Sequence, residues 1–129
     1  MNQTIPLLLV EDDPSILEIL TGALDEGGFT IKAVATAEEA IRLLEAEETT
    51  FSALITDVNM GSELTGWNVA KRAREINEEI SVIYITGGAG HEWASNGVPK
   101  SILLVKPFAP AQIVTAVSQL LNASSGNTG

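Results

Sequence analysis

The sequence contains no cysteine. This absence excludes disulfide bonds and thiolate metal sites, and it suits a reducing cytoplasm. Aromatic side chains are also scarce, with two tryptophans, one tyrosine and three phenylalanines in 129 residues. The core must therefore be aliphatic, and a hydrophobic share of 45% is ample for one folded domain.

Basic residues are few. Seven lysines and arginines stand against 17 acidic residues, which gives a formal net charge of −10 at pH 7. Nucleic acids and anionic membranes are bound by clusters of basic side chains, so neither is expected as a direct partner. No apolar run approaches the roughly 18 residues of a membrane-spanning helix, and the N-terminus shows no signal-peptide pattern. We therefore predict a cytoplasmic protein.

Short apolar segments alternate with segments of helical periodicity. Apolar segments end abruptly at polar residues, as buried strands do, and the first helical segment runs from Pro14 to a Gly27-Gly28 stop. We expect strands over residues 5–10, 29–34, 51–56, 80–86 and 101–105, and helices over residues 14–26, 36–48, 67–76, 91–96 and 110–121. Five strands alternating with helices predict an α/β fold, a parallel sheet covered by helices on both faces.

The chain is expected to form one domain over residues 1–121. The last residues, 122–129, read NASSGNTG and are small and polar. This composition predicts a disordered tail. No repeat is visible other than the alternation of strands and helices.

Polar side chains follow four of the five expected strands. Glu11 and Asp12 follow the first, Asp57 the third, Thr86 closes the fourth and Lys106 follows the fifth. The carboxyl ends of parallel strands meet at one edge of the sheet, so these side chains should converge. Crowded carboxylates need a cation, and hard oxygen ligands suit Mg²⁺. A carboxylate beside Mg²⁺ can attack phosphorus, while an ammonium and a hydroxyl stabilise the phosphoryl oxygens.

Each position also has a purely structural interpretation. Asp13 precedes Pro14 and is expected to cap the following helix rather than bind a metal. A single Asp or Thr after a strand is more often a turn residue than a reactive one. Lys106 lies between an apolar strand and Pro-Phe, where burial would be costly without a carboxylate partner. The occurrence of such residues at four strand ends together favours a functional site.

In this order and at these spacings, the motifs resemble those of response-regulator receiver domains of two-component signalling. The resemblance covers about residues 5–121 and rests on LLVEDDP, LITDVNM, YITGG and the KPF segment. It implies the flavodoxin-like receiver fold, a five-stranded parallel sheet in the order 2-1-3-4-5 sandwiched by helices.

The resemblance also implies a phosphoryl-accepting site. Asp57 corresponds to the phosphoacceptor of the family. Thr86 corresponds to the hydroxyl that turns toward the phosphoryl group. Lys106 corresponds to the lysine that pairs with the phosphoryl oxygens, and the family implies a cis bond between it and Pro107.

A magnesium site follows from the same resemblance. Glu11 and Asp12 correspond to the acid pair that holds Mg²⁺, with Asp12 as the direct ligand and Glu11 bound through water. Asp57 is the third carboxylate ligand. The backbone carbonyl of Asn59 corresponds to the group that completes the site.

Some positions depart from the family pattern. Gly61 stands where proline is usual, and Gly66 comes one residue late, so the loop after Asp57 carries an insertion. The stretch between Thr86 and Lys106 is short, which predicts a short, shifted or irregular fourth helix. Leu103 occupies the place of the family's switch aromatic. The usual coupling between the hydroxyl and an aromatic rotamer is therefore not expected.

The expected function is that of a phosphorelay receiver and not of an enzyme acting on a separate substrate. A histidine kinase or histidine phosphotransfer protein would supply the phosphoryl group. Phosphorylation would then change a surface near the fourth helix and fifth strand that contacts an unidentified downstream protein. Homodimerisation through that surface is left open.

Three other classes of protein share some of these features. Leu103 favours a docking module that does not use phosphate. A Mg²⁺-dependent phosphohydrolase would carry a second acid where this chain has Asn59. A flavodoxin-like electron carrier would bind a cofactor phosphate after the first strand, where the acids of this chain would repel it.

Overall fold

The computed structural model describes residues 6–46, 48–88 and 90–125. Strands and helices alternate as predicted, and the observed elements are β1 (Leu7–Val10), α1 (Pro14–Glu26), β2 (Ile31–Val34), α2 (Ala37–Ala46), β3 (Ala53–Asp57), α3 (Gly66–Ile76), β4 (Ser81–Thr86), the 3-10 turn η1 (Gly90–Glu92), α4 (Trp93–Asn96), β5 (Ser101–Val105) and α5 (Pro110–Ser125). Among these residues no helix is both long enough and apolar enough to cross a membrane.

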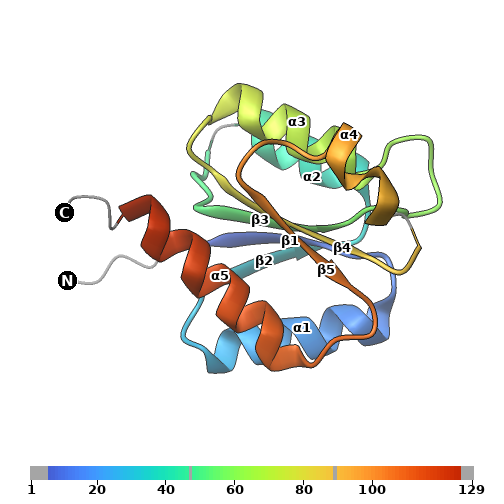
Figure 1. The fold of residues 1–129 in the computed structure, drawn as a ribbon. Coiled ribbons are helices and arrows are strands. Elements are labelled where there is room, and N and C mark those ends of the chain that lie inside the picture. Colours follow the sequence, from blue (N-terminus) through green and yellow to red (C-terminus); the bar gives the residue numbers. More distant parts are fainter. Residues whose placement is uncertain (1–5, 47, 89, 126–129) are drawn as a thin grey trace.

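All five strands run parallel in the order β2-β1-β3-β4-β5. The predicted fold class is therefore confirmed. Helices α1 and α5 cover one face of the sheet, and α2, α3 and the short α4 lie on the other (Figure 1). The carboxyl ends of all strands point to the same edge, which places the polar residues that follow them side by side.

The core consists of two aliphatic layers, one on each face of the sheet. Within β1, Leu8 and Val10 belong to the layer under α2 and α3, whereas Leu7 and Leu9 belong to the layer under α1 and α5. All four side chains are completely buried. Burial on both faces explains why the strand sequences are continuously apolar and do not alternate with polar residues.

Two of the few aromatic residues meet in the layer under α2 and α3. The ring centroids of Trp67 and Tyr84 lie 4.6 Å apart, with the planes inclined at 57°. Tyr84 is completely buried, and its hydroxyl accepts a hydrogen bond from the Val98 backbone N–H at 3.0 Å. The hydroxyl thus has a partner, as a buried polar group requires.

The first helix begins as the sequence indicates. Asp13 Oδ1 accepts hydrogen bonds from the N–H groups of Ser15 at 2.9 Å and Ile16 at 3.3 Å, which confirms the predicted cap. Thr36 Oγ1 accepts from the Glu39 N–H at 3.1 Å and caps α2 in the same way.

The α4 region is short, as expected from the spacing. A 3-10 turn leads into one turn of α-helix, and Gly97 closes it with its N–H on the Trp93 carbonyl at 2.8 Å. Pro99 follows and disfavours helical backbone at Val98. The indole N–H of Trp93 donates to Ser101 Oγ at 2.9 Å. Only residues 97–100 therefore connect α4 to β5.

The loop that enters β5 is held by a side chain from α3. Arg74 donates from Nε to the Ile80 carbonyl at 2.8 Å, and from Nη1 and Nη2 to the carbonyls of Pro99 and Lys100 at 2.5 and 3.3 Å. Burial lowers the pKa of this guanidinium. Three backbone acceptors thus share one cation, which fixes the start of β5.

Several predicted boundaries differ from the structure by one or two residues, and the end of the last helix differs by four. The expected start of the first strand, residue 5, lies outside the described residues. The expected disordered tail from Asn122 is wrong over residues 122–125, because α5 continues to Ser125. The sequence offers no glycine or proline that would end the helix before Gly126, and each further helical residue adds a backbone hydrogen bond. The remainder of the tail, residues 126–129, also lies outside the described residues.

Candidate functional site

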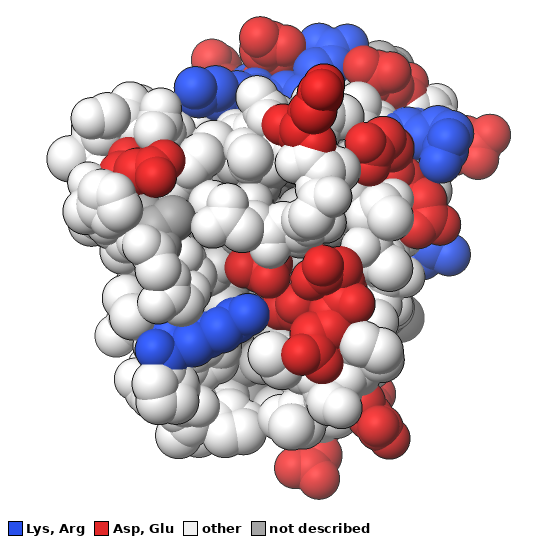
Figure 2. All heavy atoms as spheres, turned by 90° about the vertical axis from the view of Figure 1, so that its right-hand side faces the viewer, with Lys and Arg blue, Asp and Glu red and all other residues white. Residues whose placement is uncertain are grey.

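Acidic side chains gather where β1 and β3 end, and a lysine from the end of β5 lies against them. Figure 2 shows this as a central acidic cluster with a basic side chain beside it. Glu11 is 1% exposed and Asp57 5% exposed, whereas Asp12 is exposed. Two of the carboxylates are thus buried, and the third is open to solvent.

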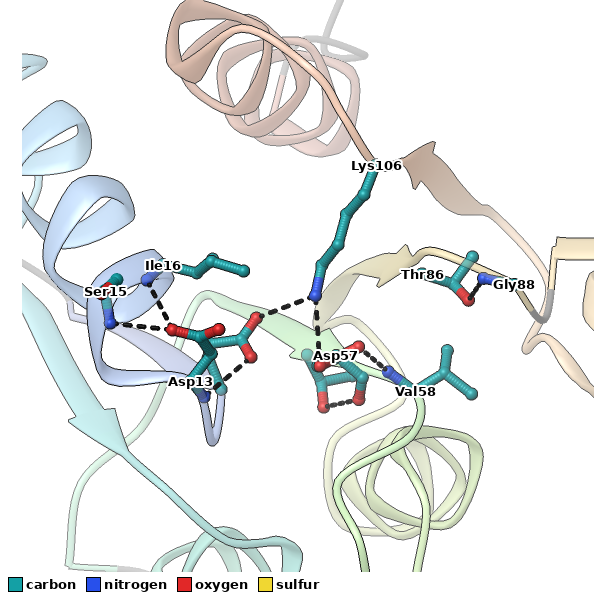
Figure 3. Close-up of polar contacts among 10 residues, drawn as sticks. Asp13, Ser15, Ile16, Asp57, Val58, Thr86, Gly88 and Lys106 are labelled. Carbon is teal, nitrogen blue, oxygen red and sulfur yellow. Dashed lines mark hydrogen bonds and ion pairs between the residues drawn. The ribbon is translucent and has the colours of Figure 1, made fainter.

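Lys106 bridges two of the carboxylates. Its Nζ lies 3.6 Å from Glu11 Oε1 and 3.4 Å from Asp57 Oδ2 (Figure 3). The prediction that this lysine needs a carboxylate partner is confirmed. The bond from Lys106 to Pro107 is cis, as the resemblance implied.

Three carboxylates lie close enough to share one cation. Glu11, Asp12 and Asp57 each offer an oxygen, and these oxygens lie within 4.8 Å of one another. Among the described residues, Glu11 Oε1 is buried without a hydrogen-bond partner, and its nearest cation, the Lys106 ammonium, lies 3.6 Å away. Buried acceptors of this kind are costly unless a cation or donor satisfies them. Hard oxygen donors with an exposed side for water fit Mg²⁺.

The electrostatics of the site are dominated by Glu11. Burial raises the pKa of Glu11 to about 7, and the charge of Asp57 adds to the rise. The Asp13 N–H, which donates to Glu11 Oε2 at 3.1 Å, and the ammonium of Lys106 oppose it. A bound cation would favour the ionised form, so metal binding and proton release at Glu11 are coupled.

The backbone around Asp57 is fixed by short contacts. Asp57 Oδ1 accepts from the Val58 N–H at 2.8 Å, and the Gly66 N–H donates to the Val58 carbonyl at 2.8 Å. A Cβ atom on Gly66 would collide with the Asp57 carbonyl oxygen. In the sequence Gly66 is recognisable only as a glycine that comes one residue late in the loop after Asp57. The contact joins positions nine residues apart, and no local pattern predicts it.

The remaining predicted site residues lie at the same edge. Thr86 is buried at the end of β4, and its Oγ1 accepts from the Gly88 N–H at 3.2 Å (Figure 3). In the sheet register Asp57 pairs with Ile85, so Thr86 stands one residue further along the neighbouring strand. Asn59 is exposed in the loop that follows Asp57. The role of its carbonyl stays a prediction.

An aromatic residue does stand beside the position where the family carries its switch aromatic. Leu103 pairs in the sheet with Tyr84 on β4. Leu103 packs against the core under α2 and α3, whereas the Tyr84 ring is buried against Trp67 and its hydroxyl is bound to Val98. Neither Leu103 nor Tyr84 is therefore placed to act as an aromatic side chain that changes between a buried and an exposed rotamer.

A doubly wound sheet with carboxylates and a lysine at its carboxyl edge defines the class of this protein. The sequence pattern of the family called response regulator receiver domain matches residues 7–118, and the chain belongs to that family. The family suggested by the motifs is confirmed. Receiver domains are signalling modules of two-component systems, they bind Mg²⁺ at an acidic pocket, and they pair with sensor histidine kinases.

Similar proteins extend over nearly the whole chain. The response regulator receiver protein CpdR of Brucella abortus is 31% identical over 120 residues, which cover 92% of this chain and 98% of CpdR. A receiver protein structure from Sinorhizobium medicae is 41% identical, covers 95% of this chain and 98% of its own, and superposes with a TM-score of 0.92. The response regulator TrrA of Thermotoga maritima, solved in complex with Mg²⁺-BeF, is 25% identical, covers 90% and 98%, and has a TM-score of 0.77.

Proposed function

We propose that this chain accepts a phosphoryl group on Asp57 from a histidine kinase or a histidine phosphotransfer protein. The observation that carries the proposal is the nearly buried Asp57 carboxylate, held between Lys106 and two further carboxylates. A cysteine-free chain suits the reducing cytoplasm, and we place the transfer there.

In the proposed transfer, an oxygen of the Asp57 carboxylate forms a bond to phosphorus. The bond from phosphorus to the donor histidine nitrogen breaks, and the imidazole leaves with the electron pair. The Val58 N–H donates a hydrogen bond to Asp57 Oδ1 and so holds the attacking carboxylate in place. Phosphorylation converts the carboxylate to an acyl phosphate, so Lys106 Nζ, now 3.4 Å from Asp57 Oδ2, pairs with the phosphoryl oxygens.

Two further groups complete the proposed site. Mg²⁺, held by Glu11, Asp12, Asp57 and the carbonyl of Asn59, would neutralise charge on the phosphoryl oxygens. The Thr86 hydroxyl stands on the neighbouring strand and would donate to a phosphoryl oxygen. The Mg²⁺-BeF complex of TrrA, whose sequence is 25% identical, supports this assignment. The modified surface would then recruit or release a downstream protein.

The test is an intact-mass measurement after incubation with acetyl phosphate or phosphoramidate and Mg²⁺. The wild-type chain should gain the mass of one phosphoryl group, and neither Asp57→Asn nor a sample with EDTA should gain it. Asp13→Asn is the matched control, because Asp13 lies near the site but caps α1, and asparagine caps equally well. This variant should be modified like the wild type.

The opposite results would remove the proposal. If no donor modifies the chain and Mg²⁺ leaves the tryptophan fluorescence unchanged, a docking module that does not use phosphate is the better function. Release of phosphate from a small ester by catalytic amounts of protein would instead favour a phosphohydrolase. Modification that survives Asp57→Asn would show that another residue is the acceptor.

A further inference from the structure

A hydroxyl interrupts the apolar part of β3 that leads to the site. Residues 53–56 read ALIT, and Thr56 is completely buried. Its neighbours in the sheet are Val10 on β1 and Tyr84 on β4. A buried hydroxyl is costly unless it is hydrogen-bonded. Thr56 Oγ1 donates to the backbone carbonyl of Asp57 at 2.8 Å, so its partner belongs to the proposed phosphoacceptor.

The Asp57 carbonyl lies where the ladder between β1 and β3 ends. The Val58 N–H donates to the Ile85 carbonyl on β4 at 3.1 Å. Because the N–H and C=O of a trans peptide group point in opposite directions, the Asp57 carbonyl faces the other neighbour, β1. The register of β1 with β3 ends at the pair of Val10 and Thr56. The Thr56 hydroxyl thus supplies a donor to a carbonyl that lies beyond the last pair.

This hydrogen bond acts on a single peptide group, the one that joins Asp57 to Val58. Its C=O end accepts from the Thr56 hydroxyl. Its N–H end donates to the Ile85 carbonyl and also, at 2.8 Å, to Asp57 Oδ1 (Figure 3). A peptide group is planar, so a rotation of the group would move both ends together. The hydroxyl that holds the carbonyl therefore also sets the direction of the N–H that holds the carboxylate.

Helix α3 lies against the same peptide group. A Cβ atom on Gly66 would collide with the Asp57 carbonyl oxygen and would lie 3.0 Å from Val58 Cα. The carbonyl thus has the buried Thr56 hydroxyl and the start of α3 as its neighbours. Removing the hydroxyl would leave this buried acceptor without its donor, and a shift of the peptide group would relieve that cost.

We propose that Thr56 is a positioning residue for the reaction at Asp57, an inference that rests on the proposed function. The Thr56 hydroxyl fixes the peptide group whose N–H holds Asp57 Oδ1. The other carboxylate oxygen, Oδ2, is then left facing Lys106 Nζ at 3.4 Å. Because Thr56 is completely buried, no phosphodonor reaches it, and it acts on the carboxylate only through the backbone.

Phosphorylation rates of variants that differ in one hydroxyl test this role. Each variant is incubated with phosphoramidate at a Mg²⁺ concentration that saturates it, and the modified fraction is followed by intact mass. Thr56→Val keeps the shape of the side chain but loses the hydroxyl, so the rate should fall at least about tenfold. Thr56→Ser keeps the hydroxyl and should react like the wild type. Thr56→Ala should be slow, and its comparison with Thr56→Ser repeats the test on a second pair.

Tyr84→Phe is the matched control. It also removes a buried hydroxyl, on the strand beside Thr56, but the partner of that hydroxyl is the Val98 N–H and not the Asp57 carbonyl. This variant should be phosphorylated at the wild-type rate. Amide hydrogen exchange gives a second readout: the Val58 amide should exchange faster in Thr56→Val, whereas in Tyr84→Phe it should exchange as in the wild type.

A Thr56→Val chain that is modified at the wild-type rate overturns the proposal, and so does a Val58 amide that exchanges equally in both chains. A Tyr84→Phe chain that slows as much as Thr56→Val also overturns it, because the loss would then come from general loosening of the core. Failure of the proposed function is a different result, since the wild-type chain itself would then remain unmodified.

Discussion

Raising the pH in the absence of metal should destabilise this fold through Glu11. Burial raises the pKa of Glu11 from 4.5 to about 7 in the folded chain. Between these values the folded chain keeps a proton that the unfolded chain has released. The free energy of unfolding therefore falls as the pH rises through this window and levels off above pH 7.

The size of the effect follows from the shift. At about 1.4 kcal/mol per pKa unit, the rise from 4.5 to about 7 corresponds to a loss on the order of 3 kcal/mol. Typical domains are stable by only about 5–15 kcal/mol, so the change is easily measured. Mg²⁺ should oppose the loss at high pH, and a concentration of a hundred times its Kd would restore about 2.7 kcal/mol.

Urea unfolding followed by the fluorescence of the buried Trp67 measures this effect between about pH 5 and pH 8. In EDTA the wild-type chain should lose stability over this range. Glu11→Gln removes the titrating group and should flatten the profile, whereas Asp13→Asn should keep the wild-type slope. A Glu11→Gln profile that runs parallel to the wild type would refute the reasoning.

Other substitutions probe single contacts. Gly66→Ala should destabilise the chain by about 2–3 kcal/mol and abolish phosphorylation, because the added Cβ meets the Asp57 carbonyl; wild-type stability in urea would contradict this. Asp13→Ala removes the cap of α1 and should cost about 1 kcal/mol in urea unfolding without changing Mg²⁺ affinity measured by titration. Tyr84→Phe leaves the Val98 N–H without its partner and should cost about 1–2 kcal/mol. The Val98 amide should also exchange faster in this variant, and unchanged exchange would show that the hydrogen bond contributes nothing.

The site was predictable because its reactive side chains follow the ends of strands. A strand that stops at Glu11-Asp12 and another that stops at Asp57 must meet at one edge of a parallel sheet. Lys106 was predictable by the same argument together with the cost of burying an unpaired ammonium. These inferences need only the order of the elements, which the apolar runs indicate.

Contacts between elements far apart in the chain could not be predicted in the same way. The bond from the Tyr84 hydroxyl to Val98 depends on how a loop folds back over β4. The contacts of Arg74 with the carbonyls before β5 depend on the length and angle of α3. No periodicity in one segment encodes such distances. The end of α5 at Ser125 differs from the prediction for another reason, since composition alone does not show whether a polar tail continues a helix.

The position of Lys106 has a mechanical consequence. This residue directly follows β5, and its ammonium already acts as the internal counterion of Glu11 and Asp57. Any change of charge at Asp57 therefore changes the electrostatic attraction on Lys106, the residue that follows the edge strand β5. The start of the same strand is anchored by Arg74. β5 is thus held at its start by Arg74 and at its end by the carboxylates of Glu11 and Asp57, so a change at Asp57 would act on the edge of the sheet through one residue, Lys106.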